Sequence, residues 1–161
     1  MKYFLAGLWF FISFSAASAQ EWVIDLGYTD FENEQAADGI AVGVELHARP
    51  FYQNQRFSLG FAGAAEVTGE GDFFVGAGLA GVYQMNNNWF IEGSVLPGYY
   101  DASSSFNDLG SEFEIRSLLG VGYRFASGNQ VSLAVSHISN AGTASINPGL
   151  NTIRIRWRRE F

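Results

Sequence analysis

Residues 112–125, with the sequence EFEIRSLLGVGYRF, alternate between two kinds of side chain. The odd-numbered positions are apolar or aromatic except for Ser117, whereas the four charged residues all occupy even-numbered positions. Successive side chains of a β-strand point to opposite faces, so this period of two predicts a strand with one apolar face and one charged face.

The same alternation recurs along the rest of the chain after its first twenty residues, and no segment there keeps a helical period. A length of 161 residues suits one domain. Seven more strands are predicted by this pattern, so that the full set is 21–29, 40–49, 56–66, 72–85, 89–100, 112–125, 130–139 and 151–161.

The charged residues of these strands nearly all share the parity opposite to the aromatic residues, with Arg159 as the exception. They are too many for a dry core, and the aromatic face is too continuous to be left in water. A barrel with its charges in the lumen and its apolar face in lipid resolves both problems. The predicted fold class is therefore all-β, an eight-stranded antiparallel transmembrane β-barrel. The inward set is Asp25, Glu45, His47, Arg49, Arg56, Glu66, Glu92, Glu112, Glu114, Arg116, Arg124, Arg154, Arg156 and Arg158.

Loop lengths and the lumen charges refine this barrel. The first, third, fifth and seventh connections are longer, which makes them the external loops if both termini are periplasmic. We expect the arginines near the C-terminus to pair with the inward glutamates and plug the lumen, so that a porin is disfavoured. Pro97 cannot donate to the ladder and predicts a bulge or an early strand end.

The composition excludes several function classes. A net charge of −7 argues against nucleic-acid binding, and the lack of cysteine excludes disulfides and thiol chemistry. Two histidines are too few for a His-rich metal centre, and no cofactor is implied. Lys2, an apolar stretch and Ala17-Ser18-Ala19 predict a signal peptide over 1–19, which leaves residues 20–161 as the barrel domain.

His137 and Ser139 carry the chemistry that the strand pattern suggests. They continue the apolar parity of the strand 130–139, so both side chains are expected on the lipid-facing side near the outer rim. A histidine base beside a serine is the minimum for an activated nucleophile. The alternative is that both residues are girdle side chains that hydrogen-bond to lipid headgroups.

The longer string His137-Ile138-Ser139-Asn140-Ala141-Gly142, followed by Asn147-Pro148-Gly149, resembles the signature of PagL-type lipid A 3-O-deacylases. These are outer-membrane β-barrel esterases that remove the 3-O-linked acyl chain of lipid A. The resemblance implies that His137 is the base and Ser139 the nucleophile, with Asn140 and Gly142 associated with the oxyanion hole. It also implies a location in the Gram-negative outer membrane.

Asn151 is the one substantive departure from the family pattern, which has a glutamate at this position. An amide oxygen can orient the imidazole but adds no charge, and the equivalent change in a serine protease lowers turnover by about four orders of magnitude. Three outcomes follow: a Ser-His-Asn enzyme of reduced rate, rescue by a loop carboxylate such as Asp101 or Asp108, or a relative without catalysis.

The leading hypothesis is thus a lipid A deacylase with lipopolysaccharide as substrate and catalytic residues His137, Ser139 and Asn151. The main rival is a non-catalytic barrel that acts as an adhesin, a stabiliser or a lipopolysaccharide-binding protein. A soluble lipocalin-like barrel is a third interpretation, which the charged inward parity disfavours. The sequence leaves open whether the protein forms a homodimer.

Overall fold

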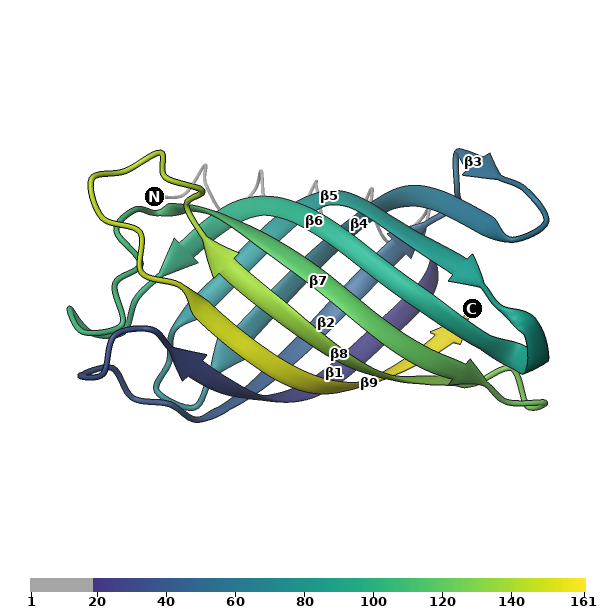
Figure 1. Ribbon diagram of the computed structural model, residues 1–161, viewed down its shortest axis with the longest axis horizontal. Helices are drawn as coiled ribbons and strands as arrows, with labels where there is room; N and C mark the ends of the chain where they lie inside the picture. The colour runs from purple at the N-terminus through teal and green to yellow at the C-terminus, as the bar shows by residue number, and fades with distance from the viewer. Residues whose placement is uncertain (1–18) are drawn as a thin grey trace, which may run out of the picture.

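The computed structural model describes residues 19–161 and shows a barrel of eight long strands (Figure 1). The predicted signal peptide lies outside the described residues, apart from Ala19 at its end. Each predicted strand is present, with bounds that agree within two residues. No helix among residues 19–161 is long and apolar enough to cross a membrane. The long strands are β1 (Ala19–Phe31), β2 (Ile40–Ala48), β4 (Phe57–Thr68), β5 (Phe73–Gln84), β6 (Trp89–Asp101), β7 (Phe113–Arg124), β8 (Gln130–Ser139) and β9 (Leu150–Glu160).

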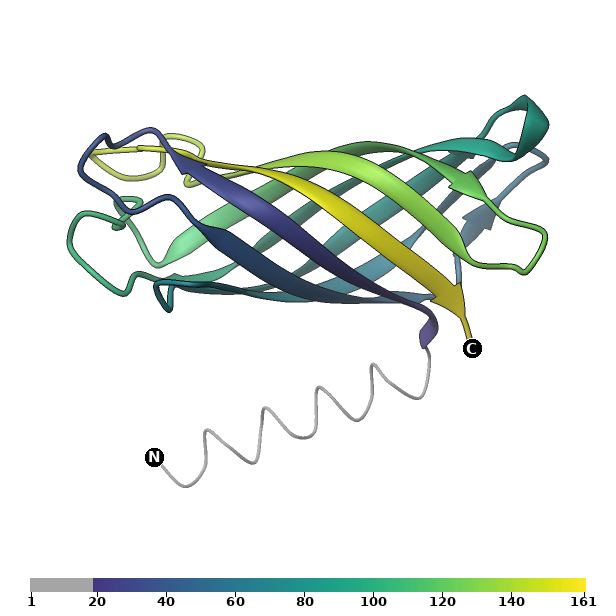
Figure 2. The ribbon, with the colours of Figure 1, turned by 90° about the horizontal axis from the view of Figure 1, so that it is seen from below.

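The sheet closes on itself through antiparallel pairs (Figure 2). Each long strand pairs with its neighbour in sequence, the first strand β1 pairs with the last strand β9, and β2 pairs with β4. β3 (Tyr52–Gln53) is a short addition that the sequence pattern did not predict, and it pairs with the first residues of β4, before the stretch that pairs with β2. Closure leaves the eight long strands without a free edge, so their backbone groups are satisfied within the barrel.

Loop length distinguishes the two ends of the barrel, although the third connection, 69–72, is shorter than the second, 49–56, and not longer as predicted. Residues 32–39, 102–112 and 140–149 form long loops at one end, with the shorter connection 69–72 beside them. Both described chain ends lie at the opposite end, where Phe161 N–H donates to the Gln20 carbonyl over 2.9 Å. A 3₁₀ turn over Asn86–Asn88 connects β5 to β6 at that same end. Outer-membrane barrels place their short turns in the periplasm, so the long loops mark the outer end.

The side-chain polarity of the barrel is inverted, as predicted, but four residues of the predicted inward set lie at strand ends outside the buried lumen: Arg49, Arg56 and Glu112 are exposed, and Arg124 is half-buried. Charged side chains such as Arg154 and Glu66 are almost fully buried in the lumen, whereas Leu26 and Ile155 on the outer wall are more than half exposed. Rings also pair on the wall near the chain termini, for example Trp22 against Trp157 at 4.7 Å between centroids. This aromatic band at one end of an apolar wall is typical of a barrel that crosses a membrane.

The lumen is filled by a network of ion pairs. Arg154 Nη1 lies 2.8 Å from Asp25 Oδ1 and 3.0 Å from Glu66 Oε2. His47 belongs to the same network, with Nε2 at 2.9 Å from Glu45 Oε2, as the sequence predicts. The other lumen pairs join Arg116 to Glu45 and Glu66, Arg156 to Glu45 and Glu92, and Arg158 to Glu21 and Glu92. The predicted plug is therefore confirmed.

The prediction that Pro97 causes a bulge or an early strand end is wrong. β6 continues to Asp101, and its register with β7 is constant across Pro97. The reason lies in the glycines around the ring. A Cβ on Gly78 would contact the Pro97 Cδ at 3.1 Å, and a Cβ on Gly98 would lie 2.6 Å from the Cα of Gly76. The missing side chains let β5 and β6 approach closely. Pro97 therefore interrupts the pairing of β5 with β6 without changing the register of the two strands.

The lumen network predicts how the barrel responds to the loss of one cation. Arg154→Met leaves the Asp25 and Glu66 carboxylates without this partner, so we expect the free energy of unfolding to fall by about 3–5 kcal/mol. Arg124→Met is the control, because the Arg124–Glu160 pair lies on the surface and should change stability by less than about 1 kcal/mol. Urea unfolding of the protein in lipid vesicles measures both. Equal effects of the two substitutions would contradict the interpretation.

Candidate active site

His137 and Ser139 lie on the outer wall near the outer end of β8. The burial of side chains alternates along β8, and both residues share the parity of the lipid-facing Val131, Leu133 and Val135. Their places in this alternation put both side chains on the outer face of the barrel and not in the lumen. The residues between and beside them, Ile138 and Asn140, are buried on the inner side.

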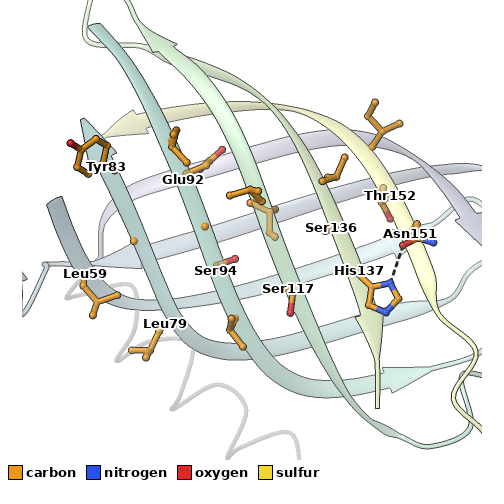
Figure 3. Close-up of a pocket in the computed structure, with 18 of the residues that line it drawn as sticks. Leu59, Leu79, Tyr83, Glu92, Ser94, Ser117, Ser136, His137, Asn151 and Thr152 are labelled. Atoms are coloured by element: carbon orange, nitrogen blue, oxygen red, sulfur yellow. Dashed lines mark hydrogen bonds between the residues drawn. The ribbon is translucent and has the colours of Figure 1, made fainter. Parts of the chain in front are cut away.

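His137 is held by the neighbouring strand. Asn151 of β9 stands directly opposite His137 in the register of the two strands. The His137 Nδ1 and Asn151 Oδ1 atoms lie 2.9 Å apart (Figure 3). An amide oxygen only accepts, so Nδ1–H donates and the lone pair of the ring remains on Nε2. This tautomer is the one that a general base needs when it takes a proton through Nε2.

The ring direction is determined by Gly149. This residue directly precedes the Leu150–Ile138 pair, so it lies in the row of Ser139. A Cβ on Gly149 would overlap the Cε1 atom of His137. The Cε1 edge of the imidazole, with Nε2 adjoining it, is therefore turned towards the end of β8 that carries Ser139.

The same empty position over Gly149 brings an acidic side chain to the ring. A Cβ there would lie 2.7 Å from Glu32 Oε1 and 3.0 Å from Glu32 Cδ. Glu32 follows β1, and its backbone N–H donates to the Gly149 carbonyl over 2.9 Å. The imidazole and the carboxylate thus both border the position that a methyl group on residue 149 would occupy.

Asp101 and Asp108, the loop carboxylates considered from the sequence, form no hydrogen bond or ion pair with His137 within residues 19–161. Asp101 ends β6, which is separated from β8 by β7. The Asp108 carboxylate accepts the Gly110 N–H over 2.8 Å within its own loop. Glu32 is not among the site residues predicted from the sequence, although its parity on β1 and the pairing of the first and last strands place it opposite Gly149.

Asn140 and Gly142 organise the loop that follows β8. The Asn140 side-chain amide donates to the carbonyls of Leu109 (3.0 Å) and Ile146 (2.8 Å), and its oxygen accepts the Gly142 N–H over 3.0 Å. The Asn140 backbone N–H donates to Asn147 Oδ1 over 2.9 Å. An oxyanion role for either residue stays a prediction, and it would require one of these bonds to be exchanged for a bond to the substrate.

The turn itself needs a glycine at position 142. Ala141 and Gly142 both have positive φ, at 55° and 77°, and Thr143 N–H closes the turn on the Asn140 carbonyl over 3.1 Å. A φ of 77° at position 142 is strained for most L-residues, whereas glycine adopts it without strain. The motif spacing after Ser139 therefore has a backbone reason as well as a chemical one.

An apolar hollow extends from the site across the outer wall (Figure 3). Its lining includes Leu119, Val95 and Leu79 on three successive strands, with His137 and Asn151 at one side. Gly81 and Gly93 also line it, and the Phe57 ring packs against the position that a Gly81 side chain would take. Among residues 19–161, no group of three or more His, Asp or Glu side chains is arranged to hold a metal ion.

A model of the family "Lipid A 3-O-deacylase (PagL)" matches residues 12–160. The chain belongs to the lipid A 3-O-deacylase family. A curated relative from Bordetella bronchiseptica, named lipid A deacylase PagL, is 36% identical over 62 residues, which cover 37% of this chain. The match spans only 35% of the length of that relative.

Solved structures of this architecture agree on the fold. The crystal structure of the outer membrane enzyme PagL has a TM-score of 0.67 at 19% identity and covers 88% of this chain and 99% of that one. Neisserial surface protein A has a TM-score of 0.59 at 11% identity, with 88% and 96% covered. The protein is an outer-membrane β-barrel of the PagL family.

The space over Gly149 gives a direct test of the site geometry. Gly149→Ala should displace the His137 ring and weaken its bond to Asn151, because the new methyl group overlaps Cε1. The chain has two histidines, so the imidazole ¹⁵N spectrum of the protein in detergent has few resonances to assign. We expect the His137 resonances to move and those of His47 to stay. Gly39→Ala is the control, because a Cβ there meets nothing within 4 Å, and an unmoved His137 spectrum in Gly149→Ala would refute the geometry.

Proposed function

We propose that this protein hydrolyses the ester-linked 3-O acyl chain of lipid A in the outer membrane, by a Ser/His mechanism at the lipid-facing rim of the barrel. The observation that carries the proposal is the His137–Asn151 hydrogen bond on the outer wall, next to Ser139, in a chain of this family. The family membership supports the substrate class and the reaction class. The residue roles follow from the motif resemblance, and the His137–Asn151 hydrogen bond and the shared outward parity of His137 and Ser139 support them.

The location of these side chains favours a lipid substrate. A histidine and a serine that face hydrocarbon are reached from within the bilayer, whereas a water-soluble ester would need a path through the loops or the lumen. The long-loop end of the barrel corresponds to the outer leaflet, in which lipopolysaccharide lies. The apolar hollow beside His137 offers a wall along which an acyl chain can lie.

The reaction needs two half-steps. Ser139 Oγ attacks the ester carbonyl while His137 Nε2 accepts the hydroxyl proton; the tetrahedral intermediate then collapses, and His137 returns the proton to the departing sugar oxygen. Water next attacks the acyl-serine with His137 again as the base, which releases the fatty acid and regenerates Ser139. Amide donors of the Asn140–Gly142 turn are the candidates for stabilising the oxyanion. This chemistry requires no metal and no cofactor.

Asn151 orients the base in this scheme. Its oxygen accepts the Nδ1–H of His137 and holds the productive tautomer. It contributes no negative charge to the imidazolium that forms during the reaction, so a lower rate than in a glutamate-containing relative is expected from this residue alone.

Replacement of the nucleophile tests the reaction. In cells that express the Ser139→Ala variant, we expect the lipid A to keep its 3-O acyl chain, because loss of the nucleophile lowers the turnover of a serine hydrolase by about 10⁶-fold. Mass spectrometry of extracted lipid A should show the deacylated species with the wild-type protein. Ser127→Ala, in a turn at the opposite end of the barrel, is the matched control and should behave as wild type. Identical lipid A from the wild-type and Ser139→Ala strains would defeat the enzymatic proposal.

The rival is a non-catalytic barrel that binds lipopolysaccharide, and Asn151 is the residue that favours it. Asn151→Glu separates the two. An intact site should gain between about tenfold and 10⁴-fold in deacylation rate from the added charge, whereas a non-catalytic barrel should gain nothing. Asn151→Ala, which removes the acceptor for Nδ1–H, should lower the rate. Association into a homodimer stays a separate prediction, which cross-linking in intact outer membranes tests.

A further inference from the structure

We propose that the Glu32 carboxylate supplies the negative charge that residue 151 lacks, so that Glu32 acts as a positioning and charge-stabilising residue for His137 while Asn151 provides only the hydrogen bond. This inference rests on the proposed hydrolase function. In a Ser-His-Asp triad, one acidic side chain both accepts the hydrogen bond of the histidine and supplies the negative charge. Here Asn151 on β9 would accept the hydrogen bond, and Glu32, directly after β1, would supply the charge.

The backbone places Glu32 next to the site. β1 and β9 pair in constant register from Glu21–Glu160 to Phe31–Leu150. The hydrogen bond from Glu32 N–H to the Gly149 carbonyl extends this ladder by one residue. The position of Glu32 is therefore fixed by the last backbone hydrogen bond between the two paired chain segments.

The side chain of Glu32 points to the same face as the imidazole. Even-numbered residues of β1, such as Tyr28 and Asp30, face outwards, and Glu32 continues that parity as an exposed residue. Its Oε1 and the His137 Cε1 both lie within contact of the position that a Cβ on Gly149 would occupy. A larger residue at 149 would separate the two groups, so the glycine is what brings the carboxylate to the ring.

The contact is suited to a charge rather than to a hydrogen bond. Nδ1 is taken by Asn151, and Nε2 must remain free for the proton of Ser139, so the Cε1 edge is the part of the ring left for a third partner. The positive charge of an imidazolium is shared across Nδ1, Cε1 and Nε2. A carboxylate beside Cε1 attracts that positive charge without competing for either nitrogen.

Other acidic residues in the neighbourhood do not share this geometry. Asp30 stands opposite Asn151 in the β1–β9 register rather than over Gly149. Glu34 lies two residues further along the same loop, and its side chain is exposed. Glu34→Gln is therefore a matched control, since it removes the same charge from the same loop.

The test combines Glu32 with position 151. Glu32→Gln should lower the deacylation rate by on the order of tenfold, Glu32→Asp should recover part of the loss, and Glu34→Gln should match wild type. In the Asn151→Glu background the charge is already supplied, so Glu32→Gln should then change the rate by less than about twofold. A full rate in Glu32→Gln, an equal loss in both backgrounds, or a loss from Asp30→Asn in its place would each overturn the assignment.

A second measurement does not depend on catalysis and separates failure of this inference from failure of the proposed function. The ¹³Cε1–¹H resonance of His137 should move in Glu32→Gln and stay in place in Glu34→Gln, in a protein that keeps the folded barrel. If the wild-type protein leaves lipid A unchanged while this resonance responds to Glu32, the proposed function fails and the Glu32–His137 contact stands. An unmoved resonance in Glu32→Gln overturns the contact whatever the activity.

Discussion

Hydrocarbon offers no hydrogen-bond partners to a polypeptide backbone, and the architecture of this protein follows from that constraint. The pairs β1–β9 and β2–β4 close the sheet, so that the long strands have no unpaired edge. Once the sheet is closed, each strand has one face towards lipid and one towards a narrow lumen. The alternation of side chains along residues 112–125 is the direct expression of this division.

Buried apolar side chains on the inner face of β8 and β9 lie directly behind the outer site. Ile138 and Leu150 are fully buried and belong to an apolar cluster at the outer end of the lumen, while their neighbours His137 and Asn151 face outwards. The site is therefore attached to two paired strands with a packed layer behind them. Such backing holds the base and its partner in a fixed orientation, which a site built on loops alone would not achieve.

The period of two was sufficient to predict the strands, their inverted polarity and the lipid-facing parity of His137 and Ser139, because each depends only on sequence order. Pairing across strands was harder to predict. Pro97 sits in an unbroken strand because glycines on two strands make room for it, and β3 is too short to produce a pattern. Glu32 is brought to the ring by the closure of the first strand on the last and by the bare Cα of Gly149, and neither fact is visible from local sequence.

The charged plug described above also determines how the barrel affects the permeability of the cell envelope. Arg116, Arg154 and Arg156 are each bound to buried carboxylates, and at most 2% of the surface of each residue is exposed to water. The middle of the cylinder therefore holds no continuous water column. A hydrated ion or a small antibiotic that followed the barrel axis would have to separate several of these pairs at once. A cell can therefore carry many copies of this protein without making its outer membrane leaky.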